Sequence, residues 1–223
     1  GKLEGLSLSS PIFDGANDYF TKTDESSFDL TTKFTLSCWA KRTVNDTAWE
    51  YVISKTHHTS RRAYAMYVQD KKLGVYVSGD GSSSNRGYVK SASEFTYNIW
   101  NHFVVTYDGS GPTLKTYING VEDTDTQTSS GTWTSVYNSS DPLAIGQGNM
   151  EVSPSVDIFT GNIRDVRVDD RVYSAEQIAS LYSGSYNVTP KHWWKLDGTV
   201  DDDEADSGTG TAYTMTKVSA PAR

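Results

Sequence analysis

The stretch FVVTYDGSGPTLKTYINGVEDT, residues 103–124, decides the fold class of this chain. Apolar side chains alternate in its first part, and the turn residues Asp108 to Pro112 end that run. Asn119-Gly120 then supplies the positive φ angles that a two-residue type I′ turn requires. The stretch therefore predicts three consecutive antiparallel strands.

Alternating segments of the same kind recur along the chain. In FTLSCWAK (residues 34–41) Leu36 and Cys38 share one face, and in KLGVYVS (residues 72–78) Leu73, Val75 and Val77 do. WNHFVVTYD (residues 100–108) is apolar on both faces, which predicts a central strand. Because Gly, Asn, Asp and Ser separate these segments, the chain is expected to be an all-β sandwich of two antiparallel sheets.

One short helix is expected near residues 175–182, in YSAEQIASLYSG. Ser174 can cap its first turn, with Gln177 as the capping-box partner and Gly184 at its end. Ile178 and Leu181 share the face that packs on the β body.

A β-bulge is expected just before this helix, in FTGNIRDVRVDD (residues 159–170). Ile163 and Val166 are three residues apart, which breaks the period of two. One extra residue near Arg164-Asp165 restores the alternation.

Composition and charge exclude several classes of protein. The chain has 223 residues, 36% of them hydrophobic, and a net charge of −8, which argues against nucleic acid as a partner. No apolar run approaches the roughly 18 residues that span a bilayer. The single Cys38 excludes an internal disulfide framework and is expected to be a buried thiol. The 14 Tyr and 6 Trp, with many Ser, Thr and Gly, indicate an extracellular protein or one of a virion or cell surface.

Five ordered segments resemble the laminin-G-like domains of the concanavalin A-like lectin/glucanase superfamily. They are SPIFDGANDYF, FTLSCWAK, WNHFVVTYDGSGPTLKTYINGVEDT, LAIGQG and FTGNIRDVRVDDRVYSAEQIASLY, between about residues 10 and 184. The resemblance implies a jelly roll of two packed sheets, one of them concave. It also implies binding of glycans or proteins through rim loops, often with calcium. Some relatives cleave glycans, so the resemblance specifies fold more than function.

The tail departs from that family pattern. HWWKLDGTVDDDEADSGTGTAYTMT (residues 192–216) resembles the stretch that usually opens such domains, but here it comes last. Either it belongs to a second, truncated domain, or residues 190–216 supply the strand that usually opens the domain. We expect the second arrangement, with residues 1–223 as one domain, because a free tail would expose two Trp side chains. The chain begins with Gly1, so it is also expected to be a processed product or part of a larger protein.

Aromatic side chains in polar segments are the candidates for sugar binding, because a pyranose ring packs on a flat aromatic ring. Trp133 and Tyr137 are the preferred residues, in SSGTWTSVYNSSDP, and Trp49 and Tyr88 are the further candidates. The alternative for each residue is burial against the edge of the sandwich.

Two acidic stretches could supply the oxygen ligands of a calcium ion. FDGANDY offers Asp14 and Asp18, and the tail offers Asp197 and Asp206 beside an Asp run. The two loops approach each other if the tail pairs beside the N-terminal strand. The alternative is that Asp14 caps a turn and the Asp run is a solvated loop. Asp165, at the expected bulge, is a weaker candidate.

The sequence lacks the motifs of a hydrolase. Glycan hydrolases of this fold place two or three carboxylates on one strand at E-x-D-x-x-E spacing, which is absent here. The predicted function is a non-catalytic carbohydrate- or ligand-binding module whose partner is a glycan or a surface protein. The alternative is a structural component, such as a decoration, fibre or filament protein, and a homo-oligomer stays open.

Overall fold

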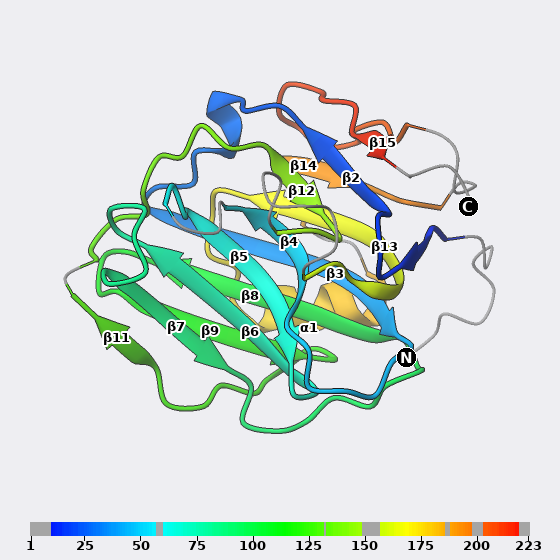
Figure 1. Cartoon of the computed structure of the whole chain (residues 1–223), viewed down its shortest axis with the longest axis horizontal. Coiled ribbons are helices and arrows are strands. Elements are labelled where there is room, and N and C mark those ends of the chain that lie inside the picture. The colour runs from blue at the N-terminus through cyan, green and yellow to red at the C-terminus, as the bar shows by residue number, and fades with distance from the viewer. Residues whose placement is uncertain are drawn as a thin grey trace.

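The computed structural model describes residues 10–56, 60–131, 133–148, 157–185, 188–197 and 203–218. Within these ranges the strands form two packed antiparallel sheets, one of seven strands and one of eight (Figure 1). The seven-stranded sheet has the order β1 (Ile12–Asp14), β13 (Thr160–Asp169), β3 (Lys33–Arg42), β8 (Asn101–Asp108), β9 (Thr113–Ile118), β10 (Val121–Glu122), and β14 (His192–Trp194) also pairs with β13. The eight-stranded sheet has the order β11 (Thr128–Ser130), β7 (Arg86–Lys90), β6 (Lys72–Ser78), β5 (Tyr64–Gln69), β4 (Glu50–Lys55), β12 (Leu143–Ile145), β2 (Tyr19–Lys22), β15 (Thr216–Val218). The predicted jelly-roll sandwich is confirmed.

The hairpin predicted from residues 103–124 is present. β8 pairs with β9, and β9 continues through Asn119 and Gly120, at φ 53° and 83°, into β10. Both φ values are positive, as a type I′ turn requires. β8 lies between β3 and β9, so its two apolar faces belong to a central strand, as the sequence predicted.

The predicted bulge lies in β13. The register between β13 and β3 shifts between Arg164 and Arg167, and Asp165 has φ 54°. This turns the Asp165 carboxylate toward Arg167, whose guanidinium donates to it at 3.2 Å. The bulge therefore positions an ion pair while Ile163 and Val166 both stay in the core.

The main core lies between the two sheets. It contains Leu36 and Cys38 from β3, Val105 from β8, and Met66 and Val75 from the opposite sheet, all fully buried. Burying each such side chain contributes roughly 1.5–3 kcal/mol, so this layer supplies most of the driving force for folding.

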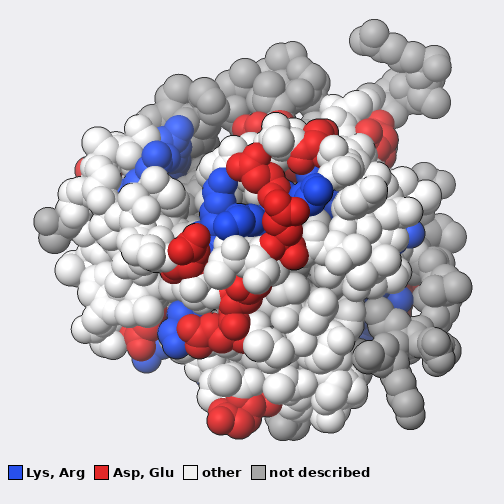
Figure 2. Space-filling model, turned by 90° about the horizontal axis from the view of Figure 1, so that it is seen from below, with Lys and Arg blue, Asp and Glu red and all other residues white. Residues whose placement is uncertain are grey.

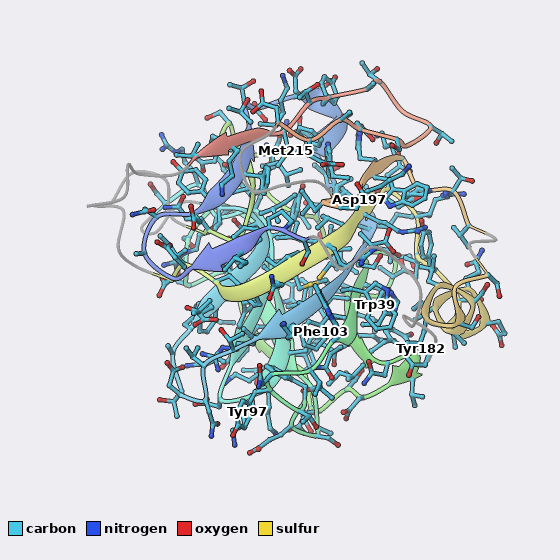
Figure 3. All side chains as sticks on the ribbon, turned by 90° about the vertical axis from the view of Figure 1, so that its right-hand side faces the viewer. Trp39, Tyr97, Phe103, Tyr182, Asp197 and Met215 are labelled. Atoms are coloured by element: carbon cyan, nitrogen blue, oxygen red, sulfur yellow. The ribbon has the colours of Figure 1, made fainter. Side chains whose placement is uncertain are left out.

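The outer face of the seven-stranded sheet is covered by α1 (Ala175–Ser183). Ser174 accepts from the Gln177 backbone, the Gln177 side chain accepts from the Ser174 backbone, and Gly184 ends the helix at φ 82°. The predicted helix and its capping box are confirmed. Ile178 and Leu181 pack on this sheet, and Figure 3 shows Tyr182 beside Trp39, with the two rings stacked at 5.6 Å.

The C-terminal segment contributes to both sheets. β14 pairs with β13 and β15 pairs with β2, and Trp194 is fully buried in the core. The indole of Trp194 donates to the Tyr213 carbonyl at 2.8 Å. The equivalence of this segment to the strand that usually opens the family's domains stays a prediction. Within the described ranges no helix combines the length and apolar character needed to cross a lipid bilayer.

Candidate functional site

A pocket of about 520 Å³ lies on the outer face of the eight-stranded sheet. Figure 1 looks onto this face, while α1 lies behind the opposite sheet. The pocket is lined by Trp49, Tyr51, Arg62, Tyr67, Gln69, Tyr76, Arg86, Tyr88, Lys90 and Asp157.

The alternation of three neighbouring strands builds the floor of this pocket. In β5, Met66 and Val68 face the main core, so Tyr67 between them faces outward. The register then places Tyr67 opposite Gly74 of β6 and Tyr76 of β6 opposite Tyr88 of β7. Tyrosine rings from three strands therefore meet on one face.

Gly74 lets the Tyr67 ring lie flat on the sheet. A Cβ at Gly74 would lie 2.2 Å from Cζ of Tyr67, so the ring occupies the space that a larger residue would fill. Trp49 stacks on Tyr67 with ring centroids 3.8 Å apart and planes 11° apart. Trp49 is half-buried and Tyr67 is fully buried, so the indole forms the upper layer of a two-ring stack.

Two polar atoms of this stack have no partner among the described residues. They are Nε1 of Trp49 and the hydroxyl of Tyr67, both buried. Burial raises the pKa of Tyr67, so the phenol stays protonated and can donate a hydrogen bond. The neighbouring Tyr76 hydroxyl already bonds to Oγ1 of Thr56. The unpartnered donors are therefore the ones that a polar ligand could use.

The four predicted ligand-binding residues lie in different environments. Trp49 and Tyr88 line the pocket. Trp133 is 4% exposed and belongs to the main core, where its ring lies on Gly87. Tyr137 is half-buried beside Gly81 and is not part of the pocket lining. For Trp133 the structure thus has the stated alternative, burial, because Gly87 leaves room for its ring under the sheet.

Tyr67 and Tyr76 were missed by the sequence analysis. Their signal is the outward position of a tyrosine in each of YAMYVQ and KLGVYVS. That signal acquires meaning only once the pairing of β5, β6 and β7 is known.

The expected calcium ligands of the N-terminal stretch serve other contacts. Oδ1 of Asp14 accepts the backbone N–H groups of Ala16, Asn17 and Asp18 at 2.8, 3.0 and 3.3 Å. Asp14 therefore caps a turn, as the alternative interpretation held. The tail does approach this region, but the contact is an ion pair between Asp18 and Nζ of Lys217 at 3.4 Å.

The expected calcium ligands of the tail do not converge with them. Oδ2 of Asp206 lies 2.6 Å from Nδ1 of His192, and Oδ1 accepts the backbone N–H groups of Trp193 and Gly208. Burial opposes ionisation of Asp206, but the hydrogen bond from His192 and the backbone donors lower its pKa overall. Asp197 is exposed on the segment after β14 (Figure 3).

The described residues hold no cluster of three His, Cys, Asp or Glu side chains that could bind a metal ion. At the bulge, Asp165 accepts from Arg167 and from Nε1 of Trp193, so it too serves another contact. Asp201 and Asp202 lie outside the described residues. The described carboxylates do not fit a calcium site, and calcium stays a prediction from the sequence.

Ser27, His192 and Asp206 form a hydrogen-bonded chain in the order of a catalytic triad. Oγ of Ser27 lies 2.9 Å from Nε2 of His192, whose other ring nitrogen contacts Asp206. His192 is fully buried between the rings of Phe28 and Trp194, at centroid distances of 5.1 and 5.6 Å. A ring enclosed in this way cannot reach a substrate. These hydrogen bonds instead connect the 3₁₀ helix η1 (Ser26–Phe28) to β14.

The family model described as "Concanavalin A-like lectin/glucanases superfamily" matches residues 14–179. The chain belongs to this superfamily. The match runs from the last residue of β1 into α1 and includes the strands that carry the pocket. A comparison with curated proteins found no match.

Several solved structures share this superfamily architecture. A proposed carbohydrate-binding protein from Bacteroides ovatus has a TM-score of 0.62 at 16% identity, over 93% of this chain and 59% of that one. The CBM40 of Ruminococcus gnavus IT-sialidase, bound to alpha2,3 sialyllactose, has a TM-score of 0.61 at 14% identity, over 80% and 99%. A heptameric SAP-like pentraxin from Limulus polyphemus has a TM-score of 0.53 at 17% identity, over 79% of each chain. At these identities the likeness concerns the fold alone.

Proposed function

We propose that this chain is a non-catalytic carbohydrate-binding domain that holds a sugar in the pocket over β4–β7. The observation that carries the proposal is the Trp49–Tyr67 stack with its two unpartnered donors. A sugar ring is apolar on its faces and polar around its rim. An indole held flat by a second ring suits the face, and the free N–H and O–H groups suit the rim.

Preorganisation of the indole supports this assignment. Tyr67 is fixed from below by Gly74 and is fully buried, so Trp49 is already held in one orientation before a ligand arrives. Little side-chain freedom is then lost on binding. A surface Trp without a second ring beneath it would lose more side-chain freedom on binding.

The charges of the pocket support binding without cleavage. Hydrolysis of a glycosidic bond by the common route uses two carboxyl groups flanking the bond. Among the described lining residues, Asp157 is the one carboxylate. A sugar in this pocket would therefore find one such group and not a pair.

The glycan partner and its setting belong to the same proposal. Two of the related structures carry carbohydrate binding in their names, and one holds a sialylated sugar. We place the ligand of this chain on an extracellular, cell or virion surface, in keeping with its content of Tyr, Trp, Ser and Thr.

A glycan array followed by calorimetry tests the proposal. Trp49→Ala is expected to lose about ten-fold or more in affinity for the best glycan, because the stacking surface is removed. Trp100→Ala is the matched control, since Trp100 is also half-buried but packs beside Lys41, outside the pocket lining. It should bind like the wild type.

Two outcomes would contradict the proposal. Equal affinity of Trp49→Ala and wild type would remove the pocket as the site. The absence of binding to any glycan, together with large symmetric assemblies in light scattering, would favour a structural protein.

A further inference from the structure

The charge of the pocket runs opposite to the charge of the chain. The chain carries a net charge of −8, and at the end of the sandwich shown in Figure 2 acidic and basic side chains lie next to one another. The pocket lining instead contains Arg62, Arg86 and Lys90 with Asp157 as its one described carboxylate. An acidic protein thus keeps a locally basic pocket.

The cations of the pocket are not equivalent. Nζ of Lys90 lies 3.1 Å from a carboxylate oxygen of Asp70, so its charge is already balanced. Arg86 has no carboxylate partner among the described residues, and its guanidinium carbon lies 5.2 Å from the ring centroid of Tyr88. Arg62 also takes part in other interactions. Arg86 is therefore the cation of the lining whose charge remains available to a ligand.

The charge of Arg86 is felt by two tyrosines of the pocket. Burial raises the pKa of Tyr67 and of Tyr76, and the positive charge of Arg86 partly opposes that rise in both. Arg86 is paired with Ser78 of β6, two residues along each strand from the Tyr76–Tyr88 pair. Arg86 and Tyr67 line one pocket.

We propose that this pocket selects acidic saccharides, and that the carboxylate or sulfate group of the ligand pairs with Arg86. The inference rests on the proposed function and names its ligand class. The planar guanidinium can donate two parallel hydrogen bonds to such a group. The sugar ring then stacks on the outer face of Trp49, whose inner face lies on Tyr67.

The same arrangement disfavours neutral sugars. A neutral ligand over Arg86 displaces water from the guanidinium without supplying an anion, and an unpaired charge that loses its water is costly. Binding of an acidic ligand removes this penalty. Both ligand classes can stack on Trp49, and Arg86 alone then makes the pocket prefer acidic over neutral sugars.

Matched pairs of ligands test the inference by calorimetry. The probes are oligogalacturonate against its carboxyl-reduced form, sialyllactose against lactose, and dextran sulfate against dextran. Wild type is expected to bind the acidic member of at least one pair about ten-fold tighter or more. The first two pairs report on carboxylates and the third on sulfates.

Three variants identify the group responsible. Arg86→Gln should lose about 10- to 100-fold in affinity for the acidic ligand and should bind the neutral one at least as tightly as wild type does, because the unpaired charge is gone. Arg86→Lys should fall between, because lysine lacks the planar fork. Lys115→Gln, in the opposite sheet and paired with Glu122, removes the same charge outside the pocket and should change neither affinity.

The outcomes separate this inference from the proposed function. Equal or tighter binding of the neutral members overturns the acidic selectivity and leaves sugar binding in place. An acidic preference that persists in Arg86→Gln also overturns it, because the anion then binds elsewhere. Absence of binding to every glycan tested overturns both. Urea unfolding of each variant, expected to match wild type because Arg86 is partly exposed, confirms that folding is unchanged.

Discussion

Replacing Gly74 by alanine disturbs the platform of the pocket without removing a ligand-binding side chain. The new Cβ would lie 2.2, 2.5 and 2.7 Å from three atoms of the Tyr67 ring, where ordinary contacts begin at 3.4 Å. The ring would have to move by roughly 1 Å, and Trp49, stacked at 3.8 Å, would have to move with it.

Three contributions determine the effect of this substitution on the free energy of unfolding. Overpacking of this kind costs about 1–3 kcal/mol. Loss of the aromatic stack adds about 0.5–1.5 kcal/mol. Replacing a glycine whose φ alanine can adopt returns about 0.4–1 kcal/mol through the unfolded chain. Gly74→Ala is therefore expected to lower the free energy of unfolding by about 0.5–4 kcal/mol and to weaken sugar binding.

Urea unfolding and calorimetric binding measure the two effects. Gly111→Ala is the control, because a Cβ at Gly111 meets nothing within 4 Å. In a Tyr67→Ala background the penalty of Gly74→Ala should disappear, since the clashing ring is absent. A Gly74→Ala protein as stable as wild type, or a penalty of the same size without the Tyr67 ring, would refute the reasoning.

Three further predictions concern buried groups. Lys55→Met should lower the free energy of unfolding by about 3–5 kcal/mol in urea, because the fully buried Lys55 ammonium pairs with Asp24 at 2.7 Å and Asp29 at 3.0 Å; an unchanged unfolding midpoint would contradict this. Burial, with a contribution from a nearby arginine, lowers the pKa of His102 to about 3. Below about pH 6.5 the histidine is therefore protonated in the unfolded chain but stays neutral in the folded protein. Stability should therefore fall by up to about 1.4 kcal/mol per pH unit toward pH 3, and His102→Phe should show a shallower slope in acid unfolding titrations. Burial raises the pKa of the Cys38 thiol, so Ellman's reagent at pH 8 should find no reactive thiol in the native protein and one after denaturation.

Much of the fold could be predicted because local residues determine it. Asn119-Gly120 specifies its turn whatever lies around it, and Ser174 with Gln177 specifies a helix start. The bulge at Asp165 followed from one broken alternation. Each of these features depends on neighbours within a few positions in the chain.

The candidate site was predicted less well because it depends on which strands pair. Trp49 and Tyr88 were among the candidates, and both line the pocket. Trp133 looked isolated in a polar segment, yet Gly87 on another strand receives its ring in the core. Tyr67 looked like an ordinary strand residue until Gly74 and Trp49 came to lie on either side of it. Contacts of this kind join distant positions, so local patterns cannot rank the candidates.

The covering of one outer face by α1 gives the molecule a back and a front. The seven-stranded side is closed by the helix, and the eight-stranded side carries the aromatic pocket. Copies attached to a support through the helix side would all present their pockets in one direction. Weak single-site affinities would then multiply through avidity on a dense carbohydrate layer, and attachment through the opposite side would abolish capture without altering the fold.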